Sequence, residues 1–443
     1  MAAAPPPTGT VVITSRDPDA DQVVPCRVVL QRLGRVKMPP KVRDSGGELS
    51  LTLPRGRYRV TVFHGLEWTA AEEEIEVVEG TLRVAVALRH VVEPGFWIGA
   101  DLHVHAKASF DSLMSYETRE RSLTATGVEV AVASDHDVSS APVSKGALGW
   151  IGGVEITRKY GHLNVFPYDI APPPKRLRTL HEITDDIRAR TPASIVQVNH
   201  PRLRGMGLFT LLHISPSRPD SLTALPRQVS HLEVFNGHDT RAKTTRANVD
   251  EWLALWEAGR PMWATGGSDA HKLSRPTPGF PRTYVPCLPV PDRSTCKTGI
   301  WLQTMLASGK AFVTSGPFIE LAQDGAWPGG PLVVTDGRAK VQVRVRAAPF
   351  VAADELVVLV GGKEVLRRDL PPRALSLGGA SGTLAEARKA TVLFDGEIDV
   401  PVATGAKTLV VVVRGRQSLR TLLPTLDIEP FAFTNPLVVE PQP

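Results

Sequence analysis

The stretch that decides the fold runs from Gly99-Ala-Asp-Leu-His103-Val-His105, through Val128-Glu-Val-Ala-Val-Ala-Ser134, to Asp135-His136-Asp137. Side chains two positions apart on a strand point to the same face, so His103 and His105 can chelate one metal ion. Asp111 follows six residues after His105, within reach if the chain turns. The apolar run at 128–134 ends abruptly in ionisable residues. That pattern is typical of a site at the carboxyl edge of a parallel sheet or barrel.

Composition is that of an ordinary globular protein with a mild basic excess. The chain has 443 residues, of which 42% are hydrophobic and 22% charged, and its formal net charge is +5. This length favours about two to three domains and a large core. No basic run carries interleaved aromatic residues, so nucleic acid is not expected as the main partner.

Cysteine usage and apolar runs restrict the class further. The three cysteines are not a disulfide framework, although Cys287 and Cys296 could pair. No apolar run approaches the length of about 18 residues needed to span a bilayer. The N-terminus lacks the basic and apolar regions of a signal peptide, so we expect a cytoplasmic protein or an exported one whose signal is absent from this chain.

Hydrophobic periodicity predicts three folded parts after a Pro-rich tail at residues 1–9. Apolar residues alternate with polar ones at Leu49, Leu51 and Leu53. Such runs, separated by turn residues, predict an N-terminal β-sandwich over residues 10–94. Strands then alternate with helices over residues 95–317. Alternation returns at Val341 and Val343, which predicts a second β-sandwich over residues 318–443.

The central part contains a series of predicted strands and two clear helices. The strands are expected at 100–104, 128–134, 151–155, 162–166, 195–200, 231–236, 262–265 and 311–314, and the helices at 240–258 and 298–308. In the first helix, Val249, Trp252, Leu253 and Trp256 have helical spacing. We expect these residues to face the core.

Ionisable and polar residues collect where the predicted central strands end. Six of the 12 histidines fall there, namely His103, His105, His136, His162, His200 and His271. Imidazole and carboxylate ligands suit Zn, Mn and Fe ions, and Glu155 could bridge two of them. Taken singly, each motif has another reading: Asp135-His136 could support a neighbouring ligand, and Ser268-Asp-Ala-His271 could cap a helix. Together they predict a metal site.

Five of these motifs carry a resemblance to a known superfamily. They are Asp-Leu-His103-Val-His105, Ser134-Asp-His136, Gly153-Val-Glu155, Asn199-His200-Pro and Ser268-Asp269-Ala-His271. Their types and order resemble the successive motifs of the PHP (polymerase and histidinol phosphatase) superfamily, over residues 97–317. Leu53-Pro-Arg-Gly-Arg-Tyr58 and Phe96-Trp-Ile-Gly-Ala-Asp-Leu-His103 resemble its carbaryl-hydrolase-like (CehA/McbA) branch.

The resemblance implies a distorted (β/α)7 barrel, flanked by the two sandwiches, with a trinuclear site of two to three divalent ions (Zn, Mn or Fe). It implies that the first metal is held by His103, His105, Glu155 and Asp269, which are also the expected catalytic residues. Glu155 would bridge to a second metal on His162 and His200, and Asp111, His136 and His271 would hold the third. One departure is Asp137, where the family more often has Asn.

Three further residues are candidates for substrate contact. Arg202, directly after the His200-Pro201 turn, and Arg282 could each grip an anion, although either could be a structural arginine. Asn236 could contact substrate or position its loop.

The function expected from this site is hydrolysis of a small anionic ester. A hydroxide generated between metals would attack a phosphoester. The same site could hydrolyse a carbamate or carboxylic ester. The alternative from another class is a binding module that keeps its metals for structure.

Overall fold

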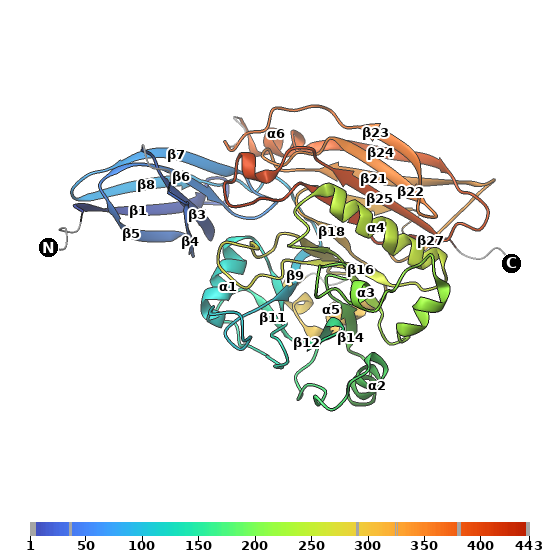
Figure 1. Ribbon diagram of the computed structural model, residues 1–443. Helices are drawn as coiled ribbons and strands as arrows, with labels where there is room; N and C mark the ends of the chain where they lie inside the picture. The colour runs from blue at the N-terminus through green and yellow to red at the C-terminus, as the bar shows by residue number, and fades with distance from the viewer. Residues whose placement is uncertain are drawn as a thin grey trace.

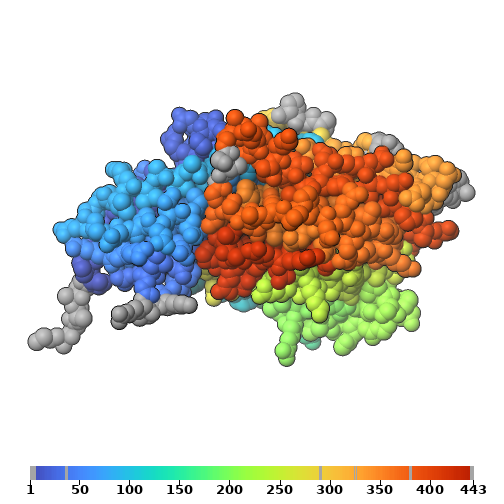
Figure 2. Space-filling view, turned by 90° about the horizontal axis from the view of Figure 1, so that it is seen from above, coloured from blue at the N-terminus to red at the C-terminus, as the bar shows by residue number. Residues whose placement is uncertain are grey.

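The computed structural model describes residues 6–34, 38–288, 292–323, 325, 327–378 and 382–439. The chain is a mixed α/β protein made mostly of sheets, which confirms the predicted class. Its N-terminal part lies beside the C-terminal part, and the central α/β part lies below both (Figure 1). Viewed from above, the C-terminal part packs directly against the N-terminal part (Figure 2).

Two four-stranded sheets form the N-terminal part. The first contains β1 (Thr8–Asp17), β2 (Gln22–Val23), β5 (Glu48–Pro54) and β8 (Thr81–Ala87); the second contains β3 (Cys26–Arg32), β4 (Lys41–Ser45), β6 (Gly56–Phe63) and β7 (Ala70–Val77). Inward-facing residues of both sheets, such as Val11, Val28 and Val60, form one core cluster. This core explains the predicted alternation of apolar and polar residues.

The central part is built on two sheets. Five strands form one sheet: β12 (Val154–Arg158), β13 (Gly161–Phe166), β14 (Ile195–Val198), β15 (His231–Asn236) and β16 (Trp263–Gly267). The second sheet carries β9 (Trp97–Val104), β10 (Val130–Ala133), β11 (Gly149–Gly152), β17 (Arg282–Pro286) and β18 (Phe312–Thr314). Isolated bridges, Val104 with Ala270 and His136 with Glu155, join the two sheets near the strand ends.

No closed barrel is found among the described residues, so the expected (β/α)7 barrel is not confirmed. The predicted strand at 151–155 instead divides at Gly153 into β11 and β12, which belong to different sheets. A Cβ at Gly153 would lie 2.7 Å from Val132 Cγ1, so the packing at this division leaves no room for a side chain. The division brings Glu155, on β12, beside His136, which follows β10.

Helices cover the sheets of the central part. They are α1 (Tyr116–Ala125), α2 (Leu180–Arg190), α3 (Leu208–Leu211), α4 (Ala242–Glu257) and α5 (Gly299–Ala307), with α6 (Leu384–Lys389) in the C-terminal part. Helix α4 buries its predicted apolar face, including Trp252 and Trp256. Both indoles donate to the carbonyl of Met262, at 2.7 and 2.9 Å, so they hold α4 against the start of β16.

The C-terminal part is continuous with the central part. A three-stranded sheet contains β19 (Phe318–Ala322), β21 (Arg338–Arg346) and β24 (Val392–Pro401). The remaining strands, β20 (Pro331–Leu332), β22 (Glu355–Val360), β23 (Lys363–Asp369), β25 (Thr408–Arg414), β26 (Phe431–Thr434) and β27 (Leu437–Val439), extend the sheet of β9 because β18 pairs with β26. The predicted division at residue 318 therefore separates segments that share one sheet.

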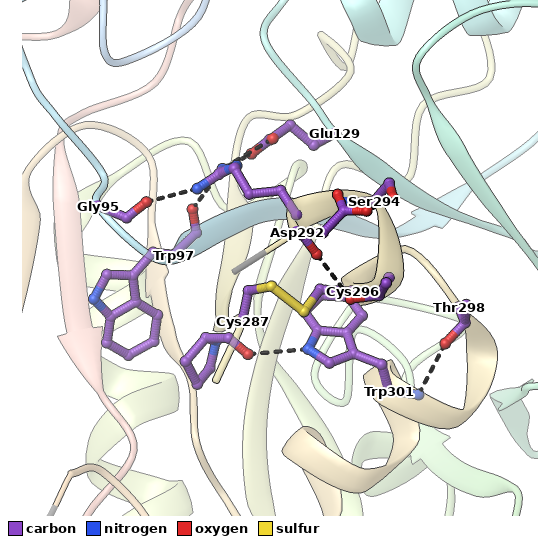
Figure 3. The surroundings of a disulfide bond; sticks show 12 residues. Gly95, Trp97, Glu129, Cys287, Asp292, Ser294, Cys296, Thr298 and Trp301 are labelled. Carbon is purple, nitrogen blue, oxygen red and sulfur yellow. Dashed lines mark hydrogen bonds and ion pairs between the residues drawn. A yellow bond between two sulfur atoms is a disulfide. The ribbon is translucent and has the colours of Figure 1, made fainter. Parts of the chain in front are cut away.

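Cys287 and Cys296 form a disulfide, one of the alternatives that the sequence left open. The bond lies beside the indole of Trp301, which donates to the carbonyl of Pro286 (Figure 3). Arg293, within the closed loop, bonds the carbonyls of Gly95 and Trp97 and thereby ties the loop to β9. Within the described ranges, no helix has the length and apolar character required to cross a membrane.

Candidate metal centre

All nine predicted metal ligands meet in one cluster. Their ligand atoms form four overlapping groups, within each of which the atoms lie no more than 4.8 Å apart. The groups are His105, Asp111, His136 and His271; His103, His105 and Asp269; His103, Glu155 and His200; and His136, Glu155 and His162. Strands β9, β12 and β13 supply His103, Glu155 and His162, whereas the other ligands follow the strands on loops.

Glu155 is the centre of the cluster, with five imidazoles around its carboxylate. Oε1 lies 3.4 Å from His103 Nε2, 3.1 Å from His162 Nδ1 and 3.5 Å from His200 Nε2. Oε2 lies 3.4 Å from His105 Nε2 and 2.9 Å from His136 Nδ1. A carboxylate whose two oxygens face different imidazole sets has the geometry of a bridging ligand.

Two aspartates complete the cluster on either side. Asp269 Oδ1 lies 3.3 Å from His103 Nε2 and 3.2 Å from His105 Nε2. Asp111 Oδ2 lies 3.2 Å from His136 Nε2 and 3.1 Å from His271 Nε2. The Asp111 side chain is 36% exposed, whereas that of Asp269 is 6% exposed, so the Asp111 group lies nearest to solvent.

The carboxylates of the cluster are held in the form that binds cations. Burial alone would raise the pKa of Glu155 and of Asp269, but the charge of His103 helps to hold both pKa values well below their usual range. Burial lowers the pKa of His105 to about 3, whereas the pKa of His103 is raised well above its usual value, against burial, by Asp269, Glu233 and Glu155, and the pKa values of His136 and His200 are also raised. Metals bind the neutral imidazole, so these last three rings would have to lose their protons when an ion binds.

Several ligand atoms are buried and make no hydrogen bond of good geometry with the described residues, although each lies within 3.3 Å of another ligand atom. They are His103 Nε2, His105 Nε2, Glu155 Oε2 and His271 Nε2. Buried polar atoms in native proteins nearly always have a partner, because an unpaired one costs free energy. These four converge on one another, and a cation would satisfy them together. The residues present therefore fit divalent metal ions.

Glu233 supports the cluster and was given no role in the sequence analysis. Its Oε1 accepts a hydrogen bond from His103 Nδ1 at 2.9 Å, and its Oε2 accepts one from the backbone N–H of His200 at 2.8 Å. Asn236 Nδ2 donates to the same Oε2 at 2.9 Å, which places Asn236 as a positioning residue. The available signal was an acid at the end of a buried strand, three residues before Asn236.

His238 was also missed. It follows β15, its side chain is 43% exposed, and its Nε2 lies 3.5 Å from Asp269 Oδ2. Its hydrogen bond with Asp269 raises its pKa.

The two arginines predicted to bind substrate are used in the fold instead. Arg202 donates to Glu251 on α4 at 2.8 Å and to the carbonyl of Ile214 at 2.6 Å. Arg282 has no exposed surface, and its guanidinium donates to the carbonyls of Gly279, Gly127 and Thr126. Because protein groups already accept hydrogen bonds from both guanidinium groups, we do not propose either arginine as a substrate ligand.

Asp137, the departure from the family pattern, fixes the loop after β10. Its Oδ1 accepts hydrogen bonds from Arg158 at 2.7 Å and from the backbone N–H of Thr157 at 3.2 Å. The residue lies in the left-handed region (φ 52°), as do the cluster residues His200 (φ 28°) and Asp269 (φ 54°). Such conformations in residues other than glycine concentrate at functional sites.

Comparison with known proteins yields distant structural likenesses. No protein-family description matches the chain, and no curated protein matches it. Solved structures that resemble it include a two-domain protein from Bacteroides vulgatus containing a predicted PHP-like metal-dependent phosphoesterase, at 14% identity and a TM-score of 0.39, covering 72% of this chain and 90% of that one. The lesion-specific endonuclease PfuEndoQ from Pyrococcus furiosus is similar at 15% identity and a TM-score of 0.29, covering 45% and 55%. These likenesses are too distant to assign a function.

Proposed function

We propose that this protein is a metal-dependent hydrolase whose His/Asp/Glu cluster holds two to three divalent ions, from among Zn, Mn and Fe. The observation that carries the proposal is the carboxylate of Glu155 among five imidazoles, with unpartnered ligand atoms facing one another. Hydrogen-bonded histidine–acid networks that only stabilise a fold do not leave such atoms unpaired.

The ligands divide into three sets in this proposal. His103, His105, Glu155 and Asp269 would hold the first metal; Glu155, His162 and His200 the second; and Asp111, His136 and His271 the third. The groups of close ligand atoms differ from these sets, because Glu155 lies with His103 and His200 in one group and with His136 and His162 in another. Bound ions would supply a hydroxide nucleophile at neutral pH and would stabilise charge on the leaving oxygen.

Side chains of the protein perform the remaining tasks. Glu233 orients His103 so that Nε2 faces the cluster. His238, half-exposed beside Asp269, is placed to deliver a proton to the leaving group. We propose a phosphoester as substrate, because several cations in one site match the charge of a phosphoryl group in its transition state.

The test combines metal content with turnover. Protein purified without chelator is assayed for bound metal and for hydrolysis of a chromogenic phosphodiester, phosphomonoester and carboxylic ester. We expect bound metal and phosphoester turnover that is lost with chelator and restored by Mn or Zn. The Glu155→Gln variant should lose both the bound metal and the phosphoester turnover. The Glu251→Gln variant, on α4 outside the cluster, should keep the metal and the turnover.

Other outcomes would change the proposal in defined ways. Turnover of the carboxylic ester alone would assign an ester or carbamate hydrolase to the same site. Bound metal with no turnover of any substrate would favour the non-catalytic binding module. Activity indifferent to chelator, or no metal after loading with Mn or Zn, would overturn the ligand assignment.

A further inference from the structure

A pocket of about 280 Å³ lies next to the metal centre, where the central part meets the C-terminal part. The loop after β15 forms one wall with His238, a second wall carries Arg275, and Thr425–Ile428 of the C-terminal part form the third. His238 belongs to both sites, because its Nε2 lies 3.5 Å from the candidate ligand Asp269. A molecule reacting at the metals could therefore extend into this pocket.

One buried hydroxyl in the pocket has no partner. Thr425 is 8% exposed, and its Oγ1 has no hydrogen-bond partner among the described residues. A buried hydroxyl without a partner costs free energy, and it is paired in most native structures. Thr425 lines the pocket, and no group among the described residues uses the hydrogen-bonding capacity of its Oγ1.

One arginine and one acid, Arg275 and Asp427, line the same pocket and lie 3.5 Å apart. Asp427 is shared with two arginines outside the lining, Arg241 at 3.7 Å and Arg420 at 3.4 Å. The side chains of Arg241, Arg275 and Arg420 are 53%, 61% and 59% exposed. Contacts this long are weak hydrogen bonds, so most of the guanidinium donors remain available.

This arrangement differs from the structural ion pairs of the same protein. Arg27 binds Asp44 through two hydrogen bonds, at 2.7 and 2.9 Å, and both side chains are at most 3% exposed. There, each charge is neutralised by one close partner. At Asp427, one carboxylate faces three loosely held guanidinium groups, so Arg275 keeps donors that can form a charge-assisted hydrogen bond with an anion in the pocket.

We propose that this pocket is a specificity subsite that takes a carboxylate on the leaving group of the substrate, with Arg275 as its cation and Thr425 Oγ1 as its buried donor. The inference rests on the proposed function and narrows it to esters whose leaving group carries a second anionic group. It also gives the C-terminal part a role, since Thr425 lies more than 100 residues beyond the candidate ligands.

The test compares two substrates that differ only in this charge, 4-carboxyphenyl phosphate and its neutral analogue 4-carbamoylphenyl phosphate. Hydrolysis of the first adds water across the P–O bond and releases inorganic phosphate and 4-hydroxybenzoate. We expect kcat/KM to favour the carboxylate about 10–100-fold, the range for hydrogen bonds to a charged group. Arg275→Gln and Thr425→Val should each reduce this preference, mainly through a higher KM for the carboxylate substrate. If only carboxylic esters are hydrolysed, the corresponding acetates replace the phosphates.

A control variant and a binding measurement make the outcomes distinct. Arg338→Gln removes an arginine of similar exposure on β21, paired with Asp399, and should leave the preference unchanged. Equal kcat/KM for the two substrates, with chelator-sensitive turnover, would overturn the subsite while the proposed function stands. If neither is hydrolysed, titration of the metal-loaded protein with 4-carboxyphenylphosphonate decides: binding weakened by Arg275→Gln supports the subsite, and no binding overturns it.

Discussion

Glu233 and His103 are 130 residues apart in the chain, yet Oε1 of one lies 2.9 Å from Nδ1 of the other, and neither side chain is exposed. The carboxylate accepts the proton of Nδ1, which leaves Nε2 as the ring nitrogen that faces Glu155 and Asp269. Such a partner fixes the tautomer and the orientation of a metal-binding histidine and raises its basicity.

The Glu233→Gln variant should therefore bind metal more weakly without losing its fold. We expect the affinity to fall about 10–100-fold, because the neutral amide is a poorer acceptor for His103. Competition with a chromogenic chelator measures this affinity, and the metal content gives a second reading. Unchanged affinity in Glu233→Gln would show that Glu233 does not act through His103.

Metal removal should lower the thermal stability of the protein. Ions that bind the folded cluster and not the unfolded chain add about 4 kcal/mol at a thousandfold excess over Kd. We expect the Tm to fall by several degrees with chelator and to recover with Mn or Zn. In Glu155→Gln the chelator effect should shrink, because the bridging carboxylate is gone. A Tm insensitive to chelator in the unmodified protein would contradict this prediction.

His231 should make stability depend on pH below neutrality. Burial lowers the pKa of His231 to about 4, while its Nε2 donates to the carbonyl of Leu306. Between its ordinary pKa near 6.5 and 4, the unfolded chain binds a proton that the folded chain does not. The free energy of unfolding should therefore decrease by about 3 kcal/mol as pH falls through this window.

The measurement for His231 is the Tm at pH 7 and at pH 4.5. The difference between the Tm at pH 7 and the Tm at pH 4.5 should be smaller for His231→Gln than for the unmodified protein. His181→Gln, at an exposed position on α2, serves as the control and should keep the full difference. If both variants behave alike, the pH dependence has another origin.

Reduction of the Cys287–Cys296 disulfide should destabilise the junction before β9. The two cysteines are nine positions apart, and closing a loop of that size contributes about 2–3 kcal/mol by chain entropy. We expect reductant to lower the Tm, and a variant with serine at both positions to have the lower Tm with or without reductant. A Cys26→Ala variant, which lacks only the unpaired third cysteine, should still respond to reductant.

Arg202→Gln offers a direct contrast with Arg275→Gln. Arg202 is bound to Glu251 and to a backbone carbonyl, so its loss should reduce stability by about 1–3 kcal/mol through the unpaired partners. The preference for a carboxylate on the leaving group should stay unchanged, as judged by kcat/KM for the two phosphates. If Arg202→Gln lowered kcat/KM only for the carboxylate substrate, Arg202 would have to be considered a substrate ligand again.

Much of the central part could be predicted because its signals are local. The strand at His231–Asn236 has the predicted bounds, and α4 buries the apolar face that its spacing indicated. The prediction was wrong where the chain passes from one sheet to another, because the strand predicted at 151–155 divides at Gly153. Periodicity carries no information about which sheet a segment joins. For the same reason, the continuity of β18 with β26 was not foreseen.

For the site, the sequence by itself determined which side chains could bind a metal, because imidazole and carboxylate groups are metal ligands by their chemistry. All nine predicted ligands do lie in one cluster. Only the tertiary structure decided which groups Arg202 and Arg282 bind. A guanidinium binds whatever acceptor the fold brings within reach, so Arg202 and Arg282 pair with Glu251 and with backbone carbonyls. Likewise, the placing of Arg275 and Thr425 around one pocket depends on the packing of two distant segments, which no local pattern encodes.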